Sequence, residues 1–113
     1  MGIEERLTDL GLALPAPLQV PPGVKLPFAW VHAVGSRVFV SGHGPTNADG
    51  TLAKPLGKVG AEVTLDEGYR AARLTALAML GSLKRELGDL DRIPGWRRVF
   101  GIPVEVEAEV GIE

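Results

Sequence analysis

The sequence TLDEGYRAARLTALAMLGSLKRELG, residues 64–88, decides the fold because it carries the signals of one long helix. Thr64 and Glu67 have the spacing of a capping box, in which each side chain bonds a free backbone N–H of the first turn. Gly88 supplies a stop signal. Apolar residues recur every three or four positions, namely Tyr69, Ala72, Ala76, Leu80, Leu83 and Leu87. We predict a helix over residues 65–87, and a second stripe (Ala71, Leu74, Ala78) indicates burial on more than one side.

Upstream of this helix, residues 28–42 are typical of a β-hairpin. Two strand-like runs, residues 28–34 and 37–41, flank Gly35-Ser36, a two-residue turn led by glycine. Both strand faces are apolar, with Phe28, Trp30 and Val34 on one face and Ala29, Val31 and Ala33 on the other. A sheet that is apolar on both faces is covered on both faces. One helix covers one of them, and we expect another subunit to cover the other.

The segment before the hairpin, residues 1–27, is predicted to hold a short helix and a connector. Ile3, Leu7 and Leu10 share one helical face within residues 3–11. Residues 12–27 contain five prolines, which lack a backbone N–H and disfavour a helix before them. We therefore expect an extended connector on the surface.

The loops and the C-terminal part complete the predicted domain. Residues 42–63 are rich in glycine and turn residues, and long loops of this kind often carry function. After the long helix we expect a polar turn at residues 89–96 and a short strand at 97–100. Strict alternation predicts a last strand at 104–110. It puts Val104, Val106, Ala108 and Val110 on one face and Glu105, Glu107 and Glu109 on the other.

Composition excludes several classes of protein. The chain has 113 residues, which fits one domain, and its formal net charge of −2 argues against a dedicated nucleic-acid-binding surface. The absence of cysteine excludes disulfides, zinc–thiolate sites, iron–sulfur clusters and cysteine nucleophiles. Two histidines are too few for a multi-histidine metal site. With neither a signal peptide nor a run of about 20 apolar residues, we expect a soluble cytoplasmic protein without membrane contact, metal or cofactor.

The sequence SGHGP, residues 41–45, ends the second predicted strand and is the first candidate site. One interpretation is a tight turn whose glycines take positive φ. The other is a ligand cradle of backbone N–H groups. Ser41 and His43 have no acidic partner nearby in the sequence, so a catalytic triad has little support. The sequence GKVG, residues 57–60, lacks the hydroxyl residue and the earlier glycine of a phosphate loop, which disfavours phosphate binding.

Two charged groups are further candidates. The glutamate row of residues 105–109 is either a solvated strand face or, if a second subunit encloses it, a set of carboxylates with raised pKa. A carboxylate of the second kind is a candidate general acid or base. Arg92, Arg97 and Arg98 lie beside Trp96 and could contact RNA through phosphates and stacking. The net negative charge of the chain makes a solvated cluster the stronger interpretation.

Taken together, these patterns resemble the YjgF/RidA family, also called the endoribonuclease L-PSP family. The resemblance covers nearly the whole chain and is closest to the longer, glycine-rich branch of the family. It rests on residues 7–12 (LTDLGL), 38–45 (VFVSGHGP), 57–60 (GKVG), 66–73 (DEGYRAAR), 88–92 (GDLDR) and 103–108 (PVEVEA). It implies a chorismate-mutase-like α+β fold, with a sheet covered by helices on one face. It also implies a homotrimer with pockets between subunits.

The resemblance also implies activities. Well-studied relatives hydrolyse reactive enamines and imines, releasing ammonia and a 2-oxo acid, so a small carboxylate or imino acid is the expected ligand. Other relatives act as ribonucleases or translation inhibitors, or have no known catalysis. Imine deamination is the leading hypothesis for this chain. A non-catalytic binding or interaction module and an endoribonuclease are the alternatives.

Residue by residue, the resemblance carries over in part. Glu105 matches the glutamate that positions water, and Phe28 matches an aromatic wall of the pocket but lacks the hydroxyl found in some relatives. Ser41, Gly42 and Gly44 match the pocket-wall turn, with His43 between the glycines. Compared with the family, a segment is missing between residues 101 and 102. That segment would hold a second helix, another strand and the arginine that grips the substrate carboxylate.

Overall fold

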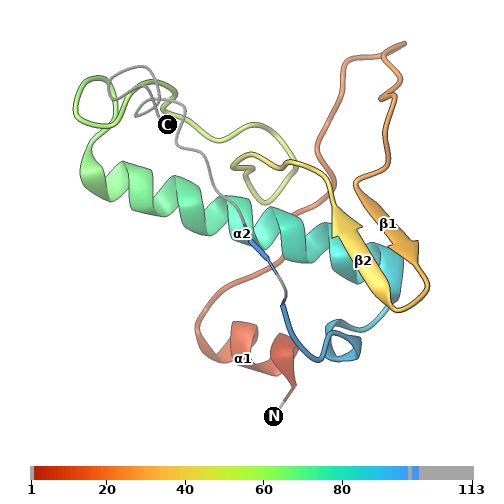
Figure 1. The fold of residues 1–113 in the computed structure, drawn as a ribbon. Helices are drawn as coiled ribbons and strands as arrows, with labels where there is room; N and C mark the ends of the chain where they lie inside the picture. Colours follow the sequence, from red (N-terminus) through yellow and green to blue (C-terminus); the bar gives the residue numbers. More distant parts are fainter. Residues whose placement is uncertain (1, 97, 100–113) are drawn as a thin grey trace.

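The computed structural model describes residues 2–96, 98 and 99. They form a small α+β fold of two helices, a two-stranded sheet and a 3₁₀ turn (Figure 1). The elements are α1 (Ile3–Asp9), β1 (Val31–Val34), β2 (Arg37–Val40), α2 (Leu65–Leu87) and η1 (Leu90–Arg92). Of the strand predicted at 97–100, residues 98 and 99 are described and do not form a strand, and the other two lie outside the described residues. The strand predicted at 104–110 lies wholly outside them.

The long helix α2 has the predicted bounds because the residues predicted to cap its two ends form the expected hydrogen bonds. The Thr64 hydroxyl accepts the Glu67 backbone N–H at 3.1 Å, and the Glu67 carboxylate accepts the Thr64 backbone N–H at 2.8 Å. At the other end, Gly88 has φ of 82° and donates its N–H to the Lys84 carbonyl at 2.8 Å. A left-handed residue of this kind ends a helix at little cost when it is glycine.

The predicted hairpin is confirmed, with shorter strands than expected. β1 pairs antiparallel with β2, from Val31 opposite Val40 to Val34 opposite Arg37, and Gly35 takes φ of 58° in the turn. Just before β1, Trp30 packs against the core, whereas Val34 at the other end of the strand is 52 % exposed.

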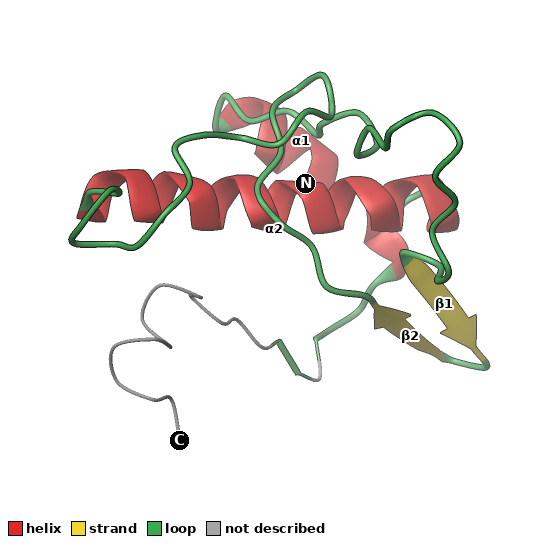
Figure 2. Ribbon diagram, turned by 90° about the horizontal axis from the view of Figure 1, so that it is seen from above, coloured by secondary structure: helices red, strands yellow, loops and turns green. Residues whose placement is uncertain are grey.

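The core lies at the C-terminal half of α2, where β1, α1 and η1 meet the helix (Figure 2). Its centre consists of Val31, Leu83 and Leu90, and Leu90 has no exposed surface. The sequence pattern placed Leu90 within a polar turn. That prediction is wrong at this residue, because η1 folds back under α2 and buries the leucine. Burying such a side chain contributes about 1.5–3 kcal/mol.

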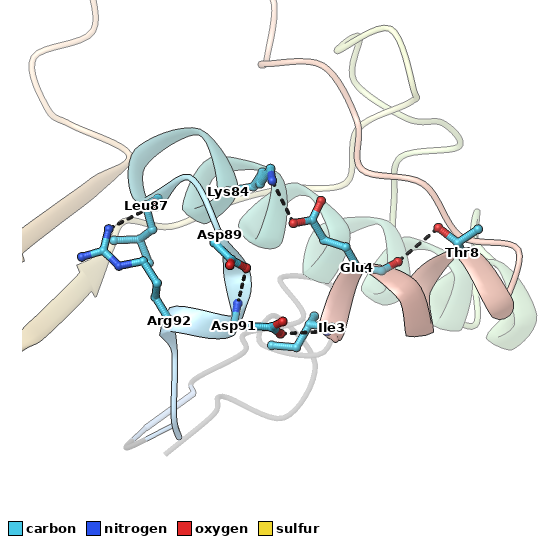
Figure 3. Close-up of polar contacts among 8 residues, drawn as sticks. All are labelled: Ile3, Glu4, Thr8, Lys84, Leu87, Asp89, Asp91 and Arg92. Atoms are coloured by element: carbon cyan, nitrogen blue, oxygen red, sulfur yellow. Dashed lines mark hydrogen bonds and ion pairs between the residues drawn. The ribbon is translucent and has the colours of Figure 1, made fainter. Parts of the chain in front are cut away.

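Polar contacts fasten α1 to this core (Figure 3). Lys84 of α2 and Glu4 of α1 form an ion pair with N···O of 2.8 Å, which raises the pKa of Lys84. The Asp91 carboxylate accepts the backbone N–H of Ile3 at 2.9 Å. On the far side of η1, the Arg92 guanidinium donates to the Leu87 carbonyl at 2.9 Å and so satisfies a free acceptor at the end of α2.

The N-terminal half of α2 extends away from the core (Figure 2). The side chain of Tyr69 is 70 % exposed, and Leu65, Ala72 and Ala76 are exposed as well. On the hairpin, Phe39 is 56 % exposed on the strand face opposite Val31. None of the helices that the structure describes has the length and apolar character needed to cross a membrane.

Candidate functional site

The turn after β2 is held in place by Ser41. Its backbone N–H donates to the Trp30 carbonyl at 2.9 Å, and its hydroxyl donates to the Ala29 carbonyl at 2.6 Å. Both acceptors lie just before β1. The turn is therefore attached to the chain that enters the hairpin, and the Ser41 hydroxyl is occupied in that attachment.

The glycines of the turn do not take positive φ, so the interpretation as a tight turn with positive φ is wrong for Gly42 and Gly44. A Cβ atom at Gly42 would meet nothing within 4 Å, and one at Gly44 would only touch Leu52. The backbone N–H groups of Gly42, His43 and Gly44 have no acceptor among the described residues. These three N–H groups are available to an acceptor on a ligand, but without a left-handed residue they do not form the backbone nest of the other interpretation.

His43 points away from the Ser41 hydroxyl and contacts α2 instead. Its Nδ1 lies 2.7 Å from the Ser41 carbonyl oxygen, and its Nε2 lies 2.8 Å from the Ser82 hydroxyl oxygen. Because a carbonyl only accepts, Nδ1 carries the proton and Nε2 accepts from Ser82. Burial lowers the pKa of His43, and Arg85 lowers it further, while the bond to Ser41 raises it. The imidazole is therefore neutral near pH 7.

Arg85 extends this set of bonds to the N-terminal connector. Its guanidinium donates to the Pro15 carbonyl at 3.2 Å and to the Ser82 hydroxyl at 3.4 Å. The result is one directed series of hydrogen bonds from Arg85 through Ser82 and His43 to Ser41. The partner of His43 is thus a serine 39 positions downstream, and no local pattern in the sequence indicates it.

A cavity of about 50 Å³ lies beside this series, between the turn and α2. Polar groups on its wall belong to His43, Thr46, Ser82 and Arg85. The Thr46 residue is only 5 % exposed, and its hydroxyl has no hydrogen-bond partner among the described residues. Thr46, Ser82 and Arg85 were not among the residues predicted for a site. A serine inside the buried stripe of a long helix is the one signal that could have indicated part of this cavity.

Aromatic rings connect the turn to the residue predicted as the pocket wall. Phe28 packs edge-on against Trp30 with ring centroids 5.0 Å apart, and Trp30 lies 4.8 Å from the His43 ring. Phe28 itself is nearly half exposed. The structure therefore brings Phe28, Ser41, Gly42, His43 and Gly44 into one region. Glu105, the predicted catalytic residue, lies outside the described residues.

The structure gives no binding site at the other segments that the sequence analysis considered, as far as their residues are described. In residues 57–60, the Glu62 carboxylate accepts the Lys58 backbone N–H at 2.8 Å, so a side-chain anion occupies a donor that a phosphate would need. Arg92 is used at the end of α2, and Arg97 of the same cluster lies outside the described residues. Within residues 2–96, 98 and 99, no three histidine or acidic side chains come close enough to hold a metal ion.

Comparisons with known proteins give the chain its relatives. It is 38 % identical over 94 residues to Protein TCP17 of Trypanosoma cruzi, covering 76 % of this chain and 56 % of the relative. A crystal structure of a candidate endoribonuclease from Shewanella oneidensis MR-1 matches with a TM-score of 0.66 at 37 % identity. That match covers 80 % of this chain and 56 % of the other.

A second solved structure is that of Atu1372 from Agrobacterium tumefaciens, a protein of unknown function. It matches with a TM-score of 0.63 at 33 % identity, over 79 % of this chain and 49 % of that protein. The chain thus spans about half the length of the relatives it matches. No protein-family model matches it. The fold, these relatives and the motifs of the sequence agree, and together they support assignment of the chain to the YjgF/RidA family, also called the endoribonuclease L-PSP family.

Proposed function

We propose that the chain is a subunit of an imine and enamine deaminase, which hydrolyses 2-imino acids to 2-oxo acids and ammonia. The observation that carries this proposal is the open turn at residues 41–44, which offers three free backbone N–H groups. These donors lie in one region with the aromatic pair of Phe28 and Trp30. A 2-imino acid carries a carboxylate next to a short apolar chain. The carboxylate can accept from the backbone N–H groups, and the apolar chain can pack against the aromatic rings.

The chemistry requires a group that activates water. Water adds to the carbon of the C=N bond while the nitrogen gains a proton. The resulting carbinolamine expels ammonia and leaves a 2-oxo acid. Glu105 is the proposed general base, on the strength of the family resemblance. The pocket is proposed to lie between subunits of a homotrimer, which would enclose the turn and desolvate the glutamate.

The test is ammonia release from 2-iminobutanoate generated in situ by an amino-acid dehydratase. We expect Glu105→Ala to lower the rate by about 10²–10⁴-fold, the usual contribution of a positioned acid or base. Glu107→Ala is the matched control, because it removes a carboxylate from the same row and should retain the wild-type rate. Equal rates in the wild type and Glu105→Ala would remove Glu105 from the mechanism.

A non-catalytic binding module is the second candidate function. It is favoured by the missing arginine, since no residue with the family's spacing remains to grip a substrate carboxylate. Thermal unfolding in the presence of 2-oxobutanoate separates the two functions, because a binder is stabilised without turnover. A folded sample that is stabilised by 2-oxobutanoate and releases no ammonia would establish binding in place of catalysis.

Endoribonuclease activity is the third candidate function, because one structural relative is named as a candidate endoribonuclease. The described residues give it less support, because Arg92 of the basic cluster is bonded to the Leu87 carbonyl. RNA cleavage that is lost on replacing Arg98 with glutamine would assign the activity to this cluster. Cleavage that persists would place the activity elsewhere.

A further inference from the structure

The cavity behind the turn is separate from the proposed pocket between subunits, and its wall includes residues of the connector, the turn and α2. The cavity is partly open to solvent, since Gly44 and Arg85 on its wall are exposed residues. Apolar side chains on its wall belong to Ala16, Leu18, Trp30, Leu52 and Ala78. Four polar side chains share the wall, those of His43, Thr46, Ser82 and Arg85. A small number of polar groups in an apolar enclosure is the usual character of a ligand site.

The polar groups of the cavity have more donors than acceptors. Both nitrogens of His43 are bonded, and the Ser82 hydroxyl donates to His43. Arg85 has five N–H bonds, of which two are directed at Pro15 and Ser82. The buried Thr46 hydroxyl has no partner among the described residues. A ligand that fits these groups should therefore supply a hydrogen-bond acceptor.

Charge indicates what kind of acceptor fits. Arg85 contributes a positive charge to the wall, and the neutral His43 adds no second charge. The described residues on the wall include no aspartate or glutamate that could neutralise Arg85. A buried hydroxyl without a partner is unfavourable, so a group that accepts from Thr46 and faces Arg85 recovers that loss. A single negative charge delocalised over two oxygens meets both requirements.

Size and wall chemistry narrow the ligand further. The cavity volume of about 50 Å³ is several times the roughly 10–15 Å³ that one water requires, which leaves room for on the order of four heavy atoms. The apolar wall suits a methyl group more than a fourth oxygen. We propose that this cavity binds a monocarboxylate of the size of acetate, with its oxygens toward Thr46 and Arg85 and its methyl group toward the apolar wall.

The experiment is a titration of the full chain with sodium acetate, followed by ¹H–¹⁵N NMR at constant ionic strength. We expect saturable shifts of the Gly44 and Thr46 amides and the Trp30 indole N–H. Thr46→Val keeps the shape of the side chain and removes the hydroxyl, and Arg85→Gln removes the charge. Each should weaken acetate binding at least tenfold. Arg70→Gln, on the exposed half of α2, is the matched control and should bind acetate as the wild type does.

Two further titrations test the size and the charge of the ligand. Sodium phosphate should give no saturable shifts at these signals, and pivalate should be excluded because it is too large. Shifts that rise linearly with acetate, equal affinity in Thr46→Val, or stronger binding of phosphate would each overturn the proposal. Glu105→Ala should retain acetate binding, so a failure of the deaminase proposal leaves this site intact and the two results can be told apart.

Discussion

His43 shows how one residue joins distant parts of the chain. It is fixed by the Ser41 carbonyl two positions away and by Ser82 on α2, and its ring lies against Trp30. The arrangement works only with a neutral imidazole, because Nε2 must accept the Ser82 proton. Protonation would turn that acceptor into a donor and add a positive charge near Arg85.

This requirement predicts a pH dependence of stability. The pKa of His43 is lowered in the folded chain, so the unfolded chain binds the proton first as the pH falls. The contribution of His43 to the free energy of unfolding is complete above its ordinary pKa of about 6.5. It is lost as the pH falls through the folded pKa. Urea unfolding at pH 7.5, 6.5 and 5.5 measures this loss.

The matched control for that measurement is the exposed His32 on β1. His43→Gln should flatten the decline in stability below pH 6.5, while His32→Gln should follow the wild type. Comparing variants at each pH removes the contribution of the carboxylates that titrate in all of them. A decline that is as steep in His43→Gln as in the wild type would show that other groups control this pH range.

Among the elements, α2 is the one that the sequence predicts most completely. Its start depends on Thr64 and Glu67, three positions apart, and its end depends on Gly88. Such local signals do not need the rest of the chain, and the same is true of the two-residue turn of the hairpin. The contacts of η1 could not be predicted in this way, because Leu90 is a single apolar residue in a polar run and its burial depends on where α1 and α2 meet.

The capping box predicts a measurable loss on mutation. Thr64→Ala removes the acceptor of the Glu67 N–H and should lower the free energy of unfolding by about 1 kcal/mol. Thr75→Ala is the matched control within α2, where the hydroxyl only bonds the Ala71 carbonyl one turn back. That change should be neutral or slightly stabilising, since alanine is the better helix former. Urea unfolding followed by far-ultraviolet circular dichroism measures both.

For the whole molecule, the sequence indicated the fold class and the family, but only part of the candidate site. It placed Phe28 and the turn at 41–44 in one pocket, and the structure brings these residues together. It did not indicate that Ser82 and Arg85 would meet the turn, because these contacts span 39 positions and 70 positions of the chain. Local patterns carry no information on such distances. The chemistry assigned to Glu105 stays a prediction.

Exposed apolar side chains on the described residues predict an interface between subunits. Phe39 lies on the hairpin face opposite the core, which the proposed trimer would cover. We expect sedimentation velocity to show a trimer for the wild type and a monomer for Phe39→Glu, since an interface tolerates an unpaired buried charge poorly. Val24→Glu, in the exposed connector, is the control and should remain trimeric. A wild-type monomer, or a trimeric Phe39→Glu, would contradict the predicted interface.

The uneven burial of α2 has a consequence for local unfolding of the molecule. Residues buried along this helix are Leu77, Ala78, Gly81, Ser82 and Leu83, all in its second half. Local opening costs least where few side-chain contacts must be broken. The first turns of the helix can therefore unwind while the last turns stay closed, and in a lone chain amide hydrogens should exchange fast at one end and slowly at the other. Any partner that covers Tyr69 would slow exchange at the fast end, so one helix reports both the folding of the subunit and its association.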